Sequence, residues 1–256
     1  YGQRIIDEFA EAGVDTSQVV FSDDMITPLA SVLVNRLTGS RTIITRKMQT
    51  PPSLTYDQKL KLDDLAERLI AAEEPVTILI DGHEPEISEY LIKKLPNARV
   101  VMDGGSLRAS NIKLAAWTDY FVVSEHFARD YMSYRSLSTE AEIKAALIEL
   151  NKICRGEAFI TLGEKGCAFL KSGMLQIVPS WLCNAVDTTG AGDVFHGAFT
   201  YGVHYSWHID NIILFASLTA AISIEKKGVR ESMPDLAVVH HSLNSYERNL
   251  TQYFEE

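Results

Sequence analysis

The stretch "NAVDTTGAGDVFHGAFTYG", from Asn184 to Gly202, joins a glycine-rich segment to an apolar helical pattern. Gly190 and Gly192 allow backbone angles that other residues resist, so consecutive N–H groups can turn inward and form a concave anion-binding nest. The helix predicted to follow adds its own N–H groups and the positive end of its dipole. The stretch therefore predicts a phosphate site at a helix N-terminus.

The segment after the nest has the apolar spacing of a helix that packs against a sheet. Asp193 falls in its first turn, beside the predicted phosphate. This acid is interpreted either as a helix-capping residue, worth roughly 0.5 to 2 kcal/mol, or as a general base that takes a proton from an attacking hydroxyl. The stretch alone leaves both interpretations open. The small or apolar face of the helix consists of Ala191, Phe195, Ala198, Phe199 and Gly202.

Composition limits the partners of the chain. Its 256 residues carry a formal net charge of −10, which disfavours nucleic acid. No apolar run approaches the roughly 18 to 20 residues that span a bilayer, so no membrane partner is expected. Cys154, Cys167 and Cys183 are far apart and form no C-x-x-C pair, which favours a reducing, cytoplasmic location.

Along the rest of the chain, helical and strand patterns alternate. Helical spacing at the start ends near Gly13, and β-branched alternation from Val19 to Arg46 surrounds a turn at 37–40, which predicts a β-hairpin. From residue 57 onward, helix and strand patterns repeat as in a parallel sheet. Strands are expected at 75–81, 98–103 and 119–124, with a strand and an antiparallel ribbon over 157–180. Helices are expected near 57–73, 85–95, 110–117, 139–154, 190–205 and 208–226.

The motif "DTTGAGD", Asp187 to Asp193, resembles the signature of the ribokinase-like sugar kinases, also called the phosphofructokinase B family. "YGQRIIDEFAEAGVDTSQV", "TPLASVLVNRLTGSRTI" and "FITLGEKGCAFL" resemble the first long helix, the β-sheet lid and the nucleotide-binding turn of that family. The resemblance covers essentially the whole chain. It implies an α/β fold, a three-layer αβα sandwich with a mostly parallel central sheet, in one domain over 1–256 with a small lid near 19–47.

The resemblance also implies site residues. Asp193 is expected as the catalytic base, with the N–H groups of Gly190, Ala191 and Gly192 as the anion hole. The turn "TLGEKG" and a late helix are expected to bind ATP, although on the residues alone they are an ordinary turn and an ordinary core face. The ATP-binding candidates are Thr161, Gly163, Gly166, Ala220, Ala221 and Ile224.

The chain departs from the family in a metal motif, Asn-x-x-Glu. Ser124 and Phe127 occupy its two defining positions, and Glu125 is a shifted substitute. This loss resembles the ketohexokinase branch. Magnesium is still expected because the phosphates of ATP need charge neutralisation. The candidate metal residue, acting through water, is Asp187 or Glu125.

A second departure concerns the sugar pocket. The family's first strand, with a sugar-binding Asp, and its Gly-Gly-Asn segment are expected upstream of Tyr1, so the sequence is interpreted as lacking the N-terminal segment. Three residues are candidate substrate contacts: Arg41, Asp103 and Arg108. A solvated hairpin arginine and a surface salt bridge are the respective alternatives for Arg41 and Arg108.

Together these features predict an ATP- and Mg²⁺-dependent carbohydrate kinase that acts on a ketose or furanose-like sugar. A homodimer through the lid is expected, because its strands have open edges and apolar residues such as Val32 and Val34. Two alternatives remain: a nucleoside or vitamin kinase of the same fold, and a sugar- or nucleotide-sensing protein that transfers nothing.

Overall fold

The computed structural model describes residues 1–256 except for 22–25, 35–40, 46–52 and 245–256. The chain divides into two compact units, Tyr1–Leu65 and Ala66–Glu256, and each is described by itself. The boundary falls inside the helix α2 (Tyr56–Ala71). That a single domain spans 1–256 stays a prediction.

The first unit contains a helix and a β-hairpin. The helix α1 (Gly2–Glu11) ends just before Gly13, whose φ of 76° lies in the left-handed region that favours glycine. The strands β1 (Ala30–Val34) and β2 (Arg41–Thr45) pair antiparallel, with Ser31 opposite Ile44. The predicted hairpin is thus confirmed, whereas its turn at 37–40 lies outside the described residues.

The predicted extent of the hairpin strands was wrong. The described residues between Val19 and Leu29 form no strand, and β1 begins two residues after Pro28. Proline has no N–H to donate to a β-ladder, so the pairing begins beyond it. Leu33 and Ile44 on the hairpin are 60% and 56% exposed. Dimerisation through this surface stays a prediction.

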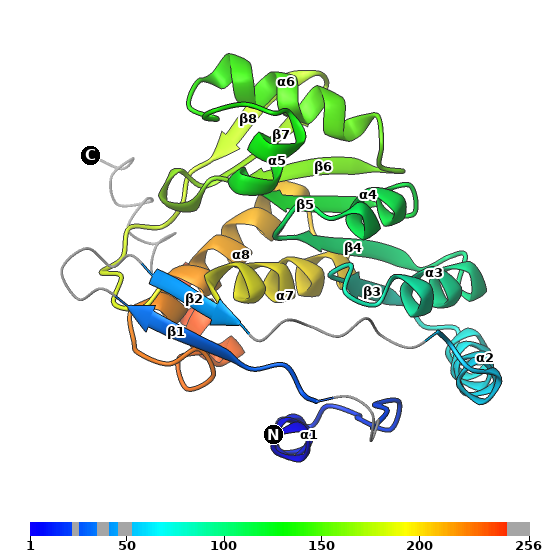
Figure 1. The fold of residues 1–256 in the computed structure, drawn as a ribbon. Coiled ribbons are helices and arrows are strands. Elements are labelled where there is room, and N and C mark those ends of the chain that lie inside the picture. Colours follow the sequence, from blue (N-terminus) through cyan, green and yellow to red (C-terminus); the bar gives the residue numbers. More distant parts are fainter. Residues whose placement is uncertain (22–25, 35–40, 46–52, 245–256) are drawn as a thin grey trace. The chain divides into compact units, whose positions relative to one another are not determined.

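The second unit is built on a six-stranded sheet with the strand order β3-β4-β5-β6-β7-β8 (Figure 1). The first four strands are parallel, and the last two continue the sheet antiparallel. Helical crossovers connect the parallel strands, as parallel pairing requires. The strands are β3 (Thr77–Ile80), β4 (Arg99–Gly104), β5 (Tyr120–Ser124), β6 (Glu157–Thr161), β7 (Cys167–Lys171) and β8 (Met174–Val178).

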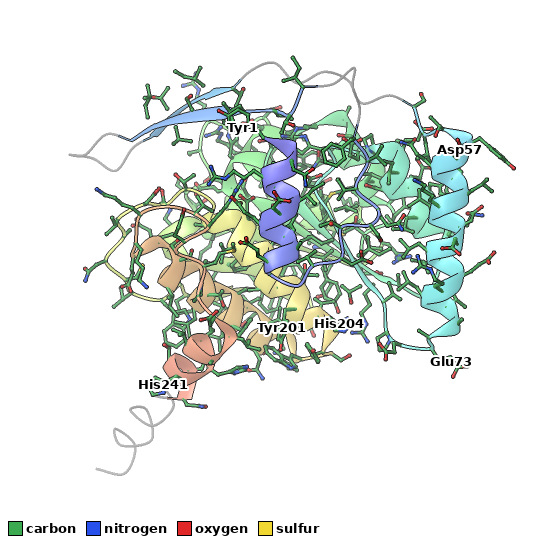
Figure 2. All side chains as sticks on the ribbon, turned by 90° about the horizontal axis from the view of Figure 1, so that it is seen from below. Tyr1, Asp57, Glu73, Tyr201, His204 and His241 are labelled. Atoms are coloured by element: carbon green, nitrogen blue, oxygen red, sulfur yellow. The ribbon has the colours of Figure 1, made fainter. Side chains whose placement is uncertain are left out.

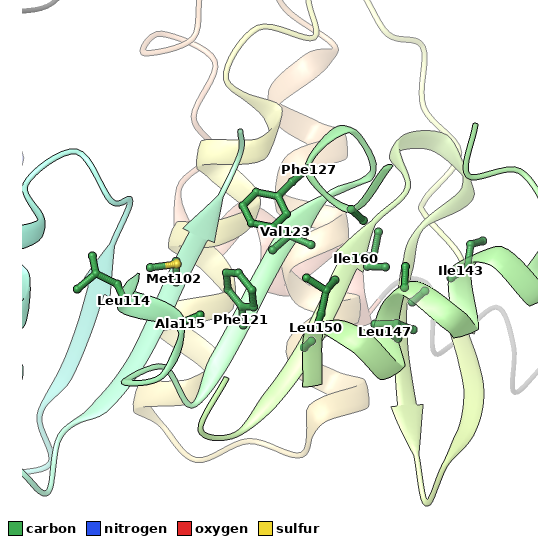
Figure 3. Packing of buried hydrophobic residues seen from close by; sticks show 14 of the residues in the cluster. Met102, Leu114, Ala115, Phe121, Val123, Phe127, Ile143, Leu147, Leu150 and Ile160 are labelled. Atoms are coloured by element: carbon green, nitrogen blue, oxygen red, sulfur yellow. The ribbon is translucent and has the colours of Figure 1, made fainter. Parts of the chain in front are cut away.

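Helices cover both faces of this sheet, so the second unit is the expected three-layer sandwich (Figure 1). Alternate strand residues point to opposite faces: Met102 and Phe121 belong to one buried cluster (Figure 3), and Val101 and Val122 to the other. Both faces are apolar, as predicted for buried parallel strands. One face is covered by α3 (Pro85–Lys94), α4 (Ala109–Ala115), α5 (Glu125–Tyr131) and α6 (Glu140–Asn151), the other by α7 (Ala191–His204) and α8 (Ile209–Ile224).

The helix α5 was not predicted from the sequence. It has seven residues, and its N-cap is Ser124, whose hydroxyl accepts a hydrogen bond from the N–H of Phe127 at 3.0 Å. Residues 236–244 are also helical. Within the described ranges, every helix is too short or too polar to cross a membrane.

Candidate active site

The N-terminus of α7 has the backbone that the signature predicts. Gly190 is the N-cap and is left-handed, with φ of 75°, and a Cβ there would lie 2.3 Å from Cγ1 of Val229. Gly192 is exposed, and a Cβ there would have no neighbouring atom within 4 Å. Gly190 is therefore required by the fold, whereas Gly192 leaves open space above the start of the helix.

The loop before α7 is attached to the end of α8. The carboxylate of Asp187 accepts the N–H of Thr189 at 3.0 Å and the N–H of Gly228 at 3.4 Å. The carbonyl of Ile224, the last residue of α8, accepts the N–H groups of Val186 at 2.7 Å and of Asp187 at 3.1 Å. These bonds fix where the nest begins relative to the second helix of this layer.

Asp193 lies in the first turn of α7 and is exposed. The first hydrogen bond of the α7 ladder runs from the N–H of Val194 to the carbonyl of Gly190 at 2.9 Å. The N–H groups that precede Val194 are therefore the helix-terminal donors of α7. That of Ala191 makes a long bond of 3.4 Å to the carbonyl of Thr188, which an anion in the nest would replace. Asp193 stands at the edge of this donor group, a position that suits both a capping acid and a base.

One turn further along α7, His196 is buried, with a side chain only 4% exposed. Its Nδ1 lies 2.6 Å from the carbonyl oxygen of Gly192 and 3.3 Å from Oδ2 of Asp103. Its Nε2 lies 3.1 Å from the carbonyl oxygen of Val122. The sequence did not single out His196; a polar ring on an apolar helix face was the available signal, but it does not identify partners so far away in the chain.

The other end of α7 is attached to the same strand, β4. The guanidinium of Arg99 donates to the carbonyl of Val203 and, at 3.2 Å, to that of His204, which is a favourable place for a cation. His204 also lies 3.3 Å from the hydroxyl of Thr77 through its Nδ1; it and Tyr201 mark this end of the helix in Figure 2. Arg99 and Asp103 of β4 thus hold the two ends of α7.

The carboxyl ends of the parallel strands meet beside the start of α7. Gly104 is opposite Val123, and Ser124 is opposite Thr161. The hydroxyl of Ser124 donates to the carbonyl of Gly105 at 2.9 Å, and that of Thr161 donates to the carbonyl of Val123 at 3.4 Å. Ligands of open α/β sheets bind at the carboxyl ends of the strands. The candidates Thr161 and Asp103 both lie at these strand ends.

The turn proposed for the nucleotide contains two glycines with different roles. Gly166 has φ of 103°, and a Cβ there would lie 2.0 Å from the carbonyl oxygen of Val178, so packing alone requires it. Gly163 has φ of 60° and open space around it. Only Gly163 therefore has the accessible backbone that a ligand could approach.

On α8, Ala221 is buried, and Ala220 packs against the same apolar cluster as α7. These contacts are those of a core face. Ile224 is half-buried, and its carbonyl holds the signature loop. A role of these three residues in binding adenine stays a prediction.

At the end of β3, a tight turn is formed by Asp81, whose Oδ1 accepts the N–H of His83 at 2.9 Å. The glycine between them has φ of 77° and would place a Cβ 2.7 Å from Oδ1 of the buried Asn111. Burial raises the pKa of Glu84 in this turn; the Asp81 charge also raises it and His83 lowers it. Acidic and imidazole groups therefore gather at this end of the sheet.

The other two substrate candidates remain predictions. Arg108 is half-buried and occupies the N-cap of α4 without a side-chain capping bond. Arg41 is the first residue of β2 in the first unit, and its side chain lies outside the described residues.

Among the described residues, no site is formed in which protein side chains alone would coordinate a metal ion. These residues contain no cluster of three or more His, Cys, Asp or Glu suited to a metal ion. Phe127, in place of the family's Glu, is fully buried and packs edge-on against Phe121 at 5.5 Å between ring centroids. Glu125 is half-buried in the first turn of α5. This donor set fits a magnesium ion held mainly by phosphates and water, with one or two carboxylates.

Comparison with known proteins connects this geometry to a family. The family described as pfkB family carbohydrate kinase matches residues 1–236. The ribokinase of Lactococcus lactis is 29% identical over 192 residues, which cover 74% of this chain and only 60% of that protein. Among solved structures, the ribokinase of Giardia lamblia superposes with a TM-score of 0.81 at 20% identity, over 96% of this chain and 79% of that one. The Arabidopsis thaliana ribokinase in complex with ribose and ATP gives 0.75 at 21%, over 94% and 78%.

Proposed function

Because the chain belongs to the pfkB family of carbohydrate kinases, we propose that the protein transfers the γ-phosphoryl group of ATP to a hydroxyl group of a sugar. The observation that carries this proposal is the start of α7. There a left-handed Gly190, an open Gly192 and an exposed Asp193 lie within four consecutive residues.

The proposed role of Asp193 is that of general base. Asp193 is an exposed residue in the first turn of α7, and we propose that a hydroxyl held near its carboxylate gives up its proton while it attacks the phosphorus atom. The proton moves to the carboxylate, the new O–P bond forms, and the bond between the β–γ bridging oxygen and the γ-phosphorus breaks. ADP leaves with the bridging oxygen.

The nest is proposed to stabilise the charge on the transferring group. The N–H groups of Gly190, Ala191 and Gly192 stand at the positive end of α7, where oxygen atoms of a phosphate are stabilised without reorganisation of the site. The attachment of Asp187 to Thr189 and Gly228 keeps these donors in place. Magnesium, when bound, neutralises negative charge on the phosphates; Glu125 and Asp187 are the carboxylates proposed to hold its water.

For the nucleotide, we propose the turn at Gly163 and the neighbouring end of β6 at Thr161. The open backbone at Gly163 supports a close approach of the ligand. For the acceptor, Asp103 and the turn after β3 supply polar groups at the carboxyl edge of the sheet. The names of the relatives favour a pentose or furanose sugar, since ribokinases, deoxyribokinases and a fructokinase are among them.

The test is an ADP-release screen with the intact protein. Candidate acceptors are pentoses, ketoses, nucleosides and keto-deoxy sugar acids, each with ATP and Mg²⁺, and a reaction without acceptor is the background. The proposal expects ADP release above background with a sugar, and mass spectrometry should find a sugar phosphate in equal amount.

Two outcomes count against this proposal. Turnover with nucleosides alone would assign a nucleoside kinase. ATP binding without ADP release for any acceptor would assign the sensing protein, the alternative that the replacement of the metal-motif Glu by Phe127 favours.

A further inference from the structure

His196 connects the phosphate nest to two strands of the sheet. Its three contacts are with Gly192 in its own helix, Asp103 at the end of β4, and Val122 in β5. Asp103 and Val122 are register partners in the parallel ladder. The imidazole therefore lies across both strands and touches the helix turn that begins the nest.

All three partners of the ring are hydrogen-bond acceptors. A backbone carbonyl can only accept, and an ionised carboxylate can only accept as well. A neutral imidazole has one N–H and one lone pair, so in either tautomer a ring nitrogen would direct its lone pair at an oxygen. A protonated Asp103 would not remove this conflict. Each ring nitrogen would still face a carbonyl oxygen, Nδ1 that of Gly192 at 2.6 Å and Nε2 that of Val122 at 3.1 Å.

All the hydrogen bonds of the ring can form when both ring nitrogens of His196 carry a proton. Nε2–H then donates to Val122, and Nδ1–H donates to Gly192 with Asp103 beside it as the counter-ion. The Asp103 side chain is 18% exposed and that of His196 4%. A buried charge requires such a partner, and the pair supplies it.

The Gly192 carbonyl belongs to the peptide group that joins Gly192 to Asp193. The helical ladder of α7 already orients this peptide plane, and a second bond from the His196 ring to the same oxygen restrains it further beside Asp193. Hydrogen bonding at a carbonyl also polarises the N–H of the same peptide, which strengthens that donor toward an anion. Both effects act at the site where phosphoryl transfer is proposed.

From this geometry we propose that His196, doubly protonated and paired with Asp103, is a positioning residue that sets the Gly192–Asp193 peptide for phosphoryl transfer. The role rests on the proposed kinase function. His196 does not touch the reacting atoms; it acts through Gly192. The Arg99 contacts hold the far end of α7, and the His196 contacts add to the bonds of the loop before α7 in holding its first turn.

Two amide substitutions separate positioning from stability. In His196→Asn the amide nitrogen reaches the place of Nδ1 and can donate to Gly192, whereas in His196→Gln it reaches the place of Nε2 and can donate to Val122. Each variant keeps one of the two carbonyl bonds, so their melting temperatures should fall by similar amounts. They form a matched pair of similar polarity that differs in which carbonyl is held.

Kinetics should distinguish the two variants. His196→Asn should keep kcat within about fivefold of wild type, and His196→Gln should lose on the order of 100-fold, the penalty for a misplaced reacting group. The dissociation constant for ATP, measured by calorimetry, should change less than about threefold in both, because the loss appears in the transition state. Equal kcat values in the two variants would reduce His196 to a structural residue and overturn the proposal.

Nitrogen NMR tests the protonation state without any catalysis. With ¹⁵N-labelled histidine near neutral pH, the signal that disappears in His196→Asn should show protons on both ring nitrogens, and Asp103→Asn should convert it to a neutral ring. A neutral His196 ring in the wild type would overturn the pairing. If the wild-type protein transfers phosphate to no acceptor, the proposed function fails and the positioning role fails with it, whereas the NMR result still decides the pairing.

Discussion

Asp187 and Gly228 lie 41 positions apart in the chain and are joined by a hydrogen bond of 3.4 Å from the Gly228 N–H to the Asp187 carboxylate. The other oxygen of that carboxylate accepts the N–H of Thr189. The signature loop is therefore shaped by the turn after α8 as well as by its own glycines. Asp187, which the sequence offered with Glu125 as a candidate metal residue, thus holds the loop before α7 through two backbone N–H groups.

Asp187→Ala should loosen the loop before α7. Both backbone N–H groups lose an ionised acceptor, and we expect the free energy of unfolding to fall by about 1 to 3 kcal/mol. The catalytic efficiency should fall on the order of 100-fold, since the nest is displaced relative to the acceptor. Urea unfolding and steady-state kinetics measure the two effects.

Asp187→Asn is the matched control, because its amide keeps one acceptor oxygen and loses the charge. It should lie between wild type and Asp187→Ala in both measurements. If the Ala variant has wild-type stability and only a changed Mg²⁺ requirement, the structural role of Asp187 is wrong and a metal role is favoured.

Substitution by alanine should destabilise the protein at Gly190 and have little effect on its stability at Gly192. Gly190→Ala places a Cβ 2.3 Å from Val229 in a left-handed backbone and should cost about 2 to 5 kcal/mol of folding stability. Gly192→Ala meets no atom within 4 Å and should leave stability within about 1 kcal/mol of wild type, because alanine favours the helix. Thermal unfolding of the two variants measures this difference.

In the proposed mechanism the open space at Gly192 is where a phosphate oxygen approaches the backbone. The stable Gly192→Ala variant should therefore lose about 10- to 1000-fold in kcat/KM. Wild-type kinetics in this variant would place the transferring phosphate elsewhere.

The sequence predicted the layers of the second unit because its signals were local. Apolar runs such as 100–102 indicated buried parallel strands, and the structure confirms them. The helix α5 was missed because seven residues are too few to show a helical periodicity. The strand region before Pro28 was overestimated because β-branched composition also occurs in irregular chain.

The candidate site was predictable in part for the same reason. Gly190, Gly192 and Asp193 are adjacent in the chain, so the start of α7 could be located from the motif alone. His196 gains its meaning from Asp103 and Val122, and no local pattern connects residues that are so distant in sequence. The requirement for Gly166 likewise comes from a close approach to Val178 that only the fold creates.

The magnesium requirement of the protein should depend on Glu125 and not on the residue at position 127. Glu125→Gln should raise the Mg²⁺ concentration for half-maximal activity severalfold, because one of the two carboxylates proposed to hold the water of the metal is removed. A magnesium titration at fixed ATP measures the change. An unchanged titration would exclude Glu125 from the metal's environment.

Phe127→Glu, which recreates the family residue, should not improve magnesium use. Position 127 is fully buried against Phe121, so a carboxylate there lacks a partner and should destabilise the protein by several kcal/mol, about 3 or more. Phe127→Leu is the apolar control and should remain folded. A folded Glu variant that needs less Mg²⁺ would show that this side chain can reach the metal.

Buried thiols should make the protein less stable in alkali. Burial raises the pKa of Cys167 to about 12 and that of Cys154 to about 11, from 9.0. The unfolded chain loses these protons first as the pH rises, so this stabilisation is complete below pH 9 and declines above it, by up to about 1.4 kcal/mol per pH unit for the fully buried Cys167 and by less for the half-buried Cys154. Urea unfolding between pH 8 and 10.5 should show a shallower decline in Cys167→Ala. Parallel pH profiles for the two proteins would contradict this.

The measurement that tests the central claim most directly is the turnover number of Asp193→Asn with the sugar found in the screen. Asn keeps the size of the side chain and can still accept a hydrogen bond, but it cannot take a proton. The account predicts that kcat falls by about 10²- to 10⁴-fold, while the calorimetric dissociation constant for ATP changes little. A near wild-type kcat in Asp193→Asn would contradict the assignment of the base, and with it the mechanism proposed for the start of α7.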